Sequence, residues 1–194
     1  MRHWIILLYE SLFPAMWIAF LVYWQVMALN TKATQRMESA AFKATRVVLM
    51  LASIALVVFP RIPEPWLYKR LYGFPVAGFW IGAAITAAGL GFAVWARVHI
   101  GRNWSRSVTI KEGHELIRTG PYALVRHPIY TGILTGMVGS AIAIGQVRGA
   151  LAVALMLASF WMKLRLEERW MRETFGAKYD DYARRVRALV PFVL

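Results

Sequence analysis

Residues 129–168 read "IYTGILTGMVGSAIAIGQVRGALAVALMLASFWMKLRLEE", two apolar runs separated by a short polar joint. The runs Ile129–Ile144 and Gly149–Met162 have the length of short membrane helices, about 14–16 residues or roughly 21–24 Å at 1.5 Å per residue. The joint "GQVRG" makes them a tight helical hairpin. Because a hairpin returns the chain to the face that it left, the sequence predicts that 114–130 and 163–175 meet in space.

The rest of the chain has the composition of a membrane protein. Of its 194 residues, 59% are hydrophobic and 17% are charged, and the mean hydropathy is +0.47; soluble domains are nearer half apolar and a quarter charged. Three further apolar stretches, Leu12–Leu29, Val47–Phe59 and Gly78–Val98, are candidate spans, since about 20 apolar residues cross a bilayer. The first has no small-residue cleavage site and is interpreted as a retained membrane segment. The absence of cysteine excludes disulfides and thiolate chemistry.

These segments predict an all-α integral membrane fold of about five membrane helices, namely three spans plus the short C-terminal hairpin, with a cytosolic C-terminal helical tail. Gly176 is the expected end of the last membrane helix after it runs on into the cytosol, and a short helix to about Ala188 follows. The glycines of "GLG" at 89–91 indicate close helix packing. The expected parts of the single membrane domain, 1–194, are the N-terminal spans, 1–77, and a catalytic core, 78–194, that includes a cytosolic linker, 99–128, and the tail, 163–194.

The net charge of +13 is unevenly distributed along the chain. Eighteen of the 23 basic residues fall in 30–46, 97–126 and 163–187, and alternation of the spans places these segments on one face of the membrane. By the positive-inside rule that face is cytosolic, and the N-terminus is then external. Topology and contact with anionic lipid headgroups explain the charge, so we expect no nucleic acid partner.

Residues 126–130, "RHPIY", stand at the mouth of the hairpin. Pro128 removes a backbone donor and bends the approach to the helix, so that Arg126 and His127 are held at the membrane surface instead of inside a continuous helix. The alternative for the arginine is a snorkelling cation at a helix end. Neither the proline nor Tyr130 would contribute to snorkelling.

Glu167 and Glu168 are adjacent at the end of the last apolar helix, about 100° apart around it. Glu168 has Arg172 one turn further on, which favours an ordinary surface ion pair. Glu167 lies along a different stripe with Lys163 one turn before it, and an ionisable group at membrane depth is by default a candidate functional group. The four histidines show no metal-ligand spacing, so we predict no metal site.

The succession of "GHELIRTGPYALVRHPIYTG" (113–132), an apolar hairpin and "EERWMRETFGAKYDDYARRV" (167–186) resembles the integral-membrane methyltransferases. These are the isoprenylcysteine carboxyl methyltransferases and the related phospholipid N-methyltransferases. The likeness covers roughly residues 85–192. The combination of these motifs is specific to that group of enzymes, whereas any one motif alone would be weak evidence for the resemblance.

The resemblance implies that S-adenosyl-L-methionine binds between the cytosolic linker and the start of the tail helix. The residues implied to line the adenosine and methionine moieties are His114, Glu115, Leu116, Ile117 and Tyr122. Those implied to close the pocket are His127, Pro128, Ile129 and Tyr130, with Glu167 and Glu168 on the ribose hydroxyls or the ammonium. The cations expected to orient an acceptor carboxylate are Lys163, Arg165 and Arg126. In eukaryotic members we expect an arginine at the position of Lys163, and lysine cannot form the two-pronged fork of arginine.

The activity implied by the resemblance is methylation of the carboxylate of a prenylated cysteine or a similar lipidic carboxylate. A carboxylate is already ionised at neutral pH, so positioning and desolvation can supply most of the acceleration without a general base. The acceptor is expected to enter from the bilayer, beside Gly132 and Gly136. The alternatives are N-methylation of a phospholipid amine, a sterol-reductase-like enzyme that uses NADPH, and a non-enzymatic membrane scaffold.

Overall fold

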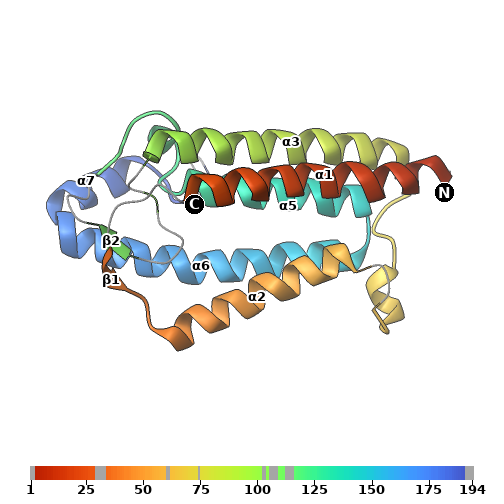
Figure 1. The fold of residues 1–194 in the computed structure, drawn as a ribbon, viewed down its shortest axis with the longest axis horizontal. Coiled ribbons are helices and arrows are strands. Elements are labelled where there is room, and N and C mark those ends of the chain that lie inside the picture. The colour runs from red at the N-terminus through yellow and green to blue at the C-terminus, as the bar shows by residue number, and fades with distance from the viewer. Residues whose placement is uncertain are drawn as a thin grey trace.

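The structure is a computed structural model that describes residues 3–28, 34–59, 62–73, 75–101, 104, 109–111 and 116–190. It is a bundle of long helices with short connecting pieces (Figure 1). In chain order the elements are α1 (His3–Ala28), β1 (Thr34–Met37), α2 (Ala40–Val58), the 3-10 helix η1 (Pro65–Tyr68), α3 (Pro75–Ile100), β2 (Thr109–Lys111), α4 (Pro121–Leu124), α5 (Pro128–Ile144), α6 (Val147–Phe175) and α7 (Ala177–Arg185).

In the part of the chain that the structure describes, four helices, α1, α2, α3 and α6, are long and apolar enough to cross a membrane. The apolar helix α5 is shorter, with 17 residues. This set confirms the predicted helical membrane fold. The expected continuation of the last helix beyond Met162 is also confirmed, because α6 runs to Phe175 and is followed by Gly176. Its 29 residues span about 43 Å, so this arm of the hairpin is much longer than its apolar part.

Small residues bring α3 and α5 into direct backbone contact. A Cβ added at Gly89 would lie 2.5 Å from the backbone nitrogen of Gly136 and 2.6 Å from the carbonyl oxygen of Gly132. The predicted close packing is therefore confirmed at Gly89, whereas Gly91 has nothing within 4 Å of an added Cβ. The two α5 glycines lie within the helix contact, so the expectation that they border a path for lipid is wrong.

The helices form two layers, with α1, α3 and α5 in one and α2 and α6 in the other (Figure 1). Hydroxyl groups bridge α2 and α6: Ser53 Oγ donates to the carbonyl oxygen of Ala152 at 2.7 Å, and Ser159 Oγ donates to that of Arg46 at 2.9 Å. Close contacts and polar bonds of this kind hold helices together where the surroundings are as apolar as the side chains. The layers are joined by the hairpin turn at Gly145 (φ 62°).

Two short strands were not predicted. β1 and β2 pair antiparallel, with Thr34 opposite Lys111 and Met37 opposite Thr109. The pair ties the chain just before α2 to the linker that leads to α4. It lies at the same end of the bundle as α7 (Figure 1). We call this end, made of β1, β2, residues 116–127 and α7, the polar end.

Candidate active site

The turn that leads into α5 sets the geometry of the polar end. α5 begins at Pro128 with His127 as its N-cap residue. Proline at the first helical position costs no hydrogen bond, since that N–H would have no partner within the helix. As predicted, Arg126 and His127 therefore precede the helix. Upstream, Gly120 has a φ of +58°, which few other residues adopt, where the chain enters the one-turn helix α4.

Arg126 joins three segments that are distant in sequence. Its Nε donates to Glu168 Oε1 at 2.9 Å, its Nη2 donates to the same oxygen, and its Nη1 donates to the carbonyl oxygens of Ala183 and Val186. The backbone adds to this contact, because Arg126 N donates to the carbonyl oxygen of Arg187 at 2.8 Å. The predicted meeting of the segments before and after the hairpin is confirmed for the described residues. The guanidinium therefore does not snorkel toward water; it links the tail to α6 through hydrogen bonds to both.

Glu168 lies at the centre of this contact. The predicted pair with Arg172 is present at 3.4 Å, but the glutamate is only 6% exposed and its nearer partners are Arg126 at 2.9 Å and His127 Nε2 at 3.3 Å. The interpretation as an ordinary surface ion pair is therefore wrong. The i,i+4 rule considers only partners on the same helix, whereas the decisive partners here come from the approach to α5.

Glu167 faces a different set of groups. The hydroxyl of Tyr130 is 2.7 Å from both carboxylate oxygens, Nδ1 of His127 is 3.6 Å from Oε2, and Nζ of Lys163 is 3.9 Å from Oε1. The glutamate side chain is 23% exposed, whereas that of Lys163 is 11% exposed. Glu167 is therefore the more open of the two acids, and it is fixed by a neutral donor and a cation.

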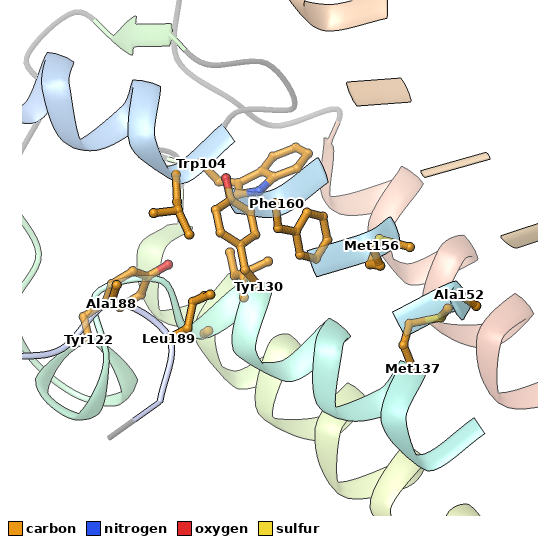
Figure 2. Packing of buried hydrophobic residues seen from close by; sticks show 12 residues of the cluster. Trp104, Tyr122, Tyr130, Met137, Ala152, Met156, Phe160, Ala188 and Leu189 are labelled. Carbon is orange, nitrogen blue, oxygen red and sulfur yellow. The ribbon is translucent and has the colours of Figure 1, made fainter. Parts of the chain in front are cut away.

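Aromatic rings form a stack beside Glu167. The rings of His127 and Tyr130 lie 5.4 Å apart and nearly parallel, and Tyr130 stacks on Phe160 at 4.8 Å. Nζ of Lys163 lies 5.3 Å from the centre of the Tyr130 ring, a cation–π contact. Figure 2 shows Tyr130 beside Phe160, in the hydrophobic cluster that also contains Trp104. One side of the site is thus flat and apolar, and the other carries ionised groups.

Tyr122 is buried next to the site. Its ring stacks with His99 at 6.3 Å, and its carbonyl oxygen accepts a hydrogen bond from the Tyr182 hydroxyl at 2.5 Å. Burial, with the added negative charge of Glu167, raises the pKa of the Tyr122 hydroxyl above its ordinary value. The hydroxyl therefore remains neutral.

The other predicted site residues are distributed as follows. Pro128 and Ile129 are buried at the start of α5, and Leu116 and Ile117 are half-buried, Ile117 against the main cluster. Arg165 is exposed, and two positions on from Lys163 place it about 200° around α6 from that residue. His114 and Glu115 lie outside the described residues.

The sequence did not single out two buried arginines that lie near the site, Arg97 and Arg46. Arg97 on α3 is 1% exposed, donates to the carbonyl oxygens of Met27 and Gly101, and lies over the Trp104 ring at 4.6 Å. Arg46 on α2 pairs with Glu38. Both arginines fall in segments whose basic residues the sequence interpretation attributed to topology. Their burial is what distinguishes these two arginines from the other basic residues, and the composition of a segment does not show which of its residues are buried.

Within the described ranges, no group of three or more histidine, aspartate or glutamate side chains could hold a metal ion. Glu167 and Glu168 are paired with Lys163 and Arg126 instead. Their chemistry is that of binding and orienting polar groups.

Comparison with known proteins places the chain in a family. Residues 77–178 match the model of the family described as phospholipid methyltransferase. The chain is 28% identical over 168 residues to a probable protein-S-isoprenylcysteine O-methyltransferase of Oryza sativa subsp. indica, covering 84% of this chain and 83% of the relative. It is 28% identical over 159 residues to protein-S-isoprenylcysteine O-methyltransferase B of Arabidopsis thaliana, covering 80% and 76%.

A third relative has a different name. The nickel-cobalt-cadmium resistance protein NccN of Alcaligenes xylosoxydans xylosoxydans is 33% identical over 113 residues, which cover 58% of this chain and 52% of that protein. The family match spans just over half of the 194 residues, and it includes nearly all of α3, the hairpin and the cluster around Glu167. The chain belongs to the phospholipid methyltransferase family and is a membrane protein of that family.

Proposed function

We propose that this membrane methyltransferase transfers a methyl group from S-adenosyl-L-methionine to the carboxylate of a prenylated cysteine or of a similar lipidic carboxylate. The observation that carries the proposal is the cluster at the polar end. There a partly exposed carboxylate, Glu167, an aromatic wall of His127 and Tyr130, and a buried cation, Lys163, lie in contact with one another. The names of the two plant relatives, both protein-S-isoprenylcysteine O-methyltransferases, support this choice of acceptor.

The donor set of the cluster fits S-adenosyl-L-methionine. That molecule carries ribose hydroxyls and an ammonium, which donate hydrogen bonds, and Glu167 offers a carboxylate that only accepts them. Tyr130 donates to both oxygens of Glu167 and so fixes its direction. When bound, the cofactor supplies a methyl group on a positively charged sulfur. The residues proposed to complete its pocket are Leu116, Ile117, Tyr122, Pro128 and Ile129, with His114 and Glu115 included by resemblance.

The cations have different roles in this proposal. Arg126 is occupied by Glu168 and two tail carbonyls, so we assign Arg126 and Glu168 to positioning the tail instead of to ligand contact. Arg165 is exposed on another face of α6. Of the three predicted cations, Lys163 is the one beside Glu167, and it would orient the acceptor carboxylate.

The chain's own residues would act by orienting the two reactants and by excluding water from them. The acceptor carboxylate is ionised at neutral pH, so no side chain needs to remove a proton. Lys163 holds the carboxylate through charge, and the stacked rings of His127, Tyr130 and Phe160 exclude water from the reacting atoms. Holding two reactants in line converts an encounter into an effectively unimolecular step, which can be worth about 7–11 kcal/mol.

N-methylation of a phospholipid amine is the second candidate. The description of the matching family favours it. An amine acceptor would have to lose a proton and would be repelled by a buried cation such as Lys163, whereas a carboxylate would be attracted. The charge of the site therefore favours the carboxylate.

We further propose that the polar end, with the C-terminus, faces the cytosol and that the N-terminus is external. Eighteen of the 23 basic residues fall in 30–46, 97–126 and 163–187, and β1, β2 and α7, which belong to these segments, lie at that end; this distribution supports the orientation. In this proposal residues 78–194 form the catalytic core, which contains the cofactor site, and residues 1–77 form the N-terminal spans. The acceptor's lipid chain would then remain in the bilayer while its carboxylate reaches the polar end.

A competition between acceptors tests the proposal. The purified protein in lipid nanodiscs is given S-adenosyl-L-methionine with a labelled methyl group, together with an S-farnesylcysteine derivative and phosphatidylethanolamine in equal amounts. We expect label on the farnesylated carboxylate, and inhibition by S-adenosylhomocysteine that is competitive with the donor. Label on phosphatidylethanolamine alone would replace the first candidate by the second. No transfer and no binding of S-adenosylhomocysteine would refute both.

A further inference from the structure

A second buried ion pair lies next to the proposed acceptor site. Arg46 Nε donates to Glu38 Oε2 at 3.1 Å, and Arg46 Nη2 lies 2.5 and 2.6 Å from the two carboxylate oxygens. The two side chains are 9% and 1% exposed. The Phe42 ring lies 5.6 Å from the guanidinium carbon. Glu38 and Phe42 therefore hold the guanidinium in one orientation.

The pair faces the part of α6 that carries Lys163. Ser159 Oγ donates to the carbonyl oxygen of Arg46, and Lys163 lies one turn further along the same face of α6. Ser53 pairs with Ala152 and Arg46 with Ser159, so α2 and α6 run antiparallel, and Glu38, which precedes α2, lies toward the Lys163 turn of α6. The N-terminal half of the chain thus adds a second cation to the proposed acceptor site.

Stability alone is a weak reason to keep this pair. Removing two charges from water costs several kcal/mol per ion, and replacing a buried ion pair by apolar residues is often neutral or stabilising. The α2–α6 contact already has the hydroxyl bonds of Ser53 and Ser159. An ionised pair buried at the start of a membrane helix is more readily explained by a ligand.

The unused donors of Arg46 identify the type of ligand. A guanidinium carries five N–H donors, and Glu38 engages those on Nε and Nη2. Among the described residues, no hydrogen bond uses the two donors on Nη1 of Arg46. A guanidinium that is fixed along one edge and keeps two donors on the other suits a carboxylate, which arginine binds more directionally than lysine does.

We infer that Arg46, oriented by Glu38, binds the acceptor carboxylate together with Lys163 and makes the site selective for an anionic acceptor. This inference rests on the proposed function. One carboxylate oxygen forms the new bond to the methyl carbon, while the electron pair of the broken carbon–sulfur bond stays on the donor's sulfur. The carboxylate charge disappears in that step. The ester product therefore loses its attraction to Arg46 and Lys163 and can leave.

The test removes both charges together. Arg46→Met alone would leave Glu38 as an uncompensated buried charge, so the main variant is the double substitution Arg46→Met/Glu38→Leu. Arg46→Lys keeps the charge and loses the fork. Arg148→Met is the matched control, because Arg148 binds the other end of α2 through the carbonyl oxygens of Leu56 and Phe59, at 3.2 and 2.9 Å.

The measurements separate acceptor binding from donor binding. In the double variant we expect the KM for the farnesylated carboxylate to rise at least tenfold, about 1.4 kcal/mol. The Kd for S-adenosylhomocysteine should be unchanged, and the neutral methyl ester product should inhibit the double variant and the wild-type protein equally. Arg46→Lys should give an intermediate KM, and Arg148→Met a wild-type KM.

An unchanged acceptor KM in the double variant overturns the inference and leaves the proposed function standing. If the double variant does not fold, an unchanged KM in Arg46→Lys has the same meaning. Equal losses of acceptor and donor affinity also overturn it, because the pair would then act through the fold. A wild-type protein that methylates no carboxylate overturns the proposed function itself.

Discussion

Replacing Glu168 by glutamine removes one charge from the centre of the polar end and nearly preserves the side-chain shape. The carboxylate is 6% exposed and accepts hydrogen bonds from Arg126 and His127, so the amide leaves the Arg126 cation without its buried partner. Breaking a buried ion pair in this way costs about 3–5 kcal/mol. In a chain of this size each kcal/mol lowers Tm by roughly 2–4 °C, so we expect a fall of roughly 6–20 °C.

Replacing Glu167 by glutamine should have the opposite effect: little loss of stability and a large loss of affinity for the donor. Its side chain is 23% exposed, and an amide oxygen can still accept the Tyr130 hydroxyl that lies 2.7 Å away. The loss of stability should be below about 1 kcal/mol, as for partly exposed ion pairs. The affinity for the donor should fall at least tenfold, about 1.4 kcal/mol, because a neutral amide binds ribose hydroxyls and an ammonium less well than a carboxylate.

Thermal unfolding followed by tryptophan fluorescence and calorimetric titration with S-adenosylhomocysteine, both in the same detergent, measure the two effects. Glu64→Gln, an exposed glutamate just before η1, is the control and should change neither quantity. The reasoning is refuted if Glu168→Gln unfolds at the wild-type temperature. It is also refuted if Glu167→Gln binds the donor analogue as tightly as the wild-type protein does.

Three other outcomes are expected. Gly89→Leu should lower Tm sharply, since its Cβ would enter the α5 backbone, whereas Gly91→Leu should not; equal effects would contradict the packing of α3. Burial raises the pKa of Tyr182, so its bond to Tyr122 stabilises the fold fully below about pH 10 and progressively less above it. Tyr182→Phe should therefore cost about 1 kcal/mol in urea unfolding at neutral pH, and a cost that grows with pH would be inconsistent. Accessibility labelling should reach loop 62–73 from outside and the C-terminus only from the cytosol, and the reverse pattern would overturn the proposed orientation.

The long helices and their convergence could be predicted because their signals are local and strong. The apolar runs, the hairpin joint and Gly176 each mark one element, and the return of the hairpin brings Arg126 to Glu168 without further information. The strands β1 and β2 could not be predicted, since four and three residues carry no periodic signal. The face of α5 that holds Gly132 was also misassigned, because lipid and protein neighbours are equally apolar.

The candidate site could be predicted in part. The resemblance grouped His127, Tyr130 and Glu167, and these side chains are in contact. The partners of Glu168 were missed because Arg126 lies outside the helix whose spacing was considered. Arg46 was counted only among the topology charges, and its burial against α6 depends on how two distant helices pack.

The bond that carries the transferred methyl group tests the central claim most directly. Product formed from labelled S-adenosyl-L-methionine and a farnesylated cysteine derivative is treated with mild alkali, and the volatile label is counted. A carboxyl methyl ester hydrolyses and releases labelled methanol, which is the result that we predict. Label that stays on the lipid after alkali would show methylation at nitrogen and would contradict the assignment of this protein as a carboxyl methyltransferase.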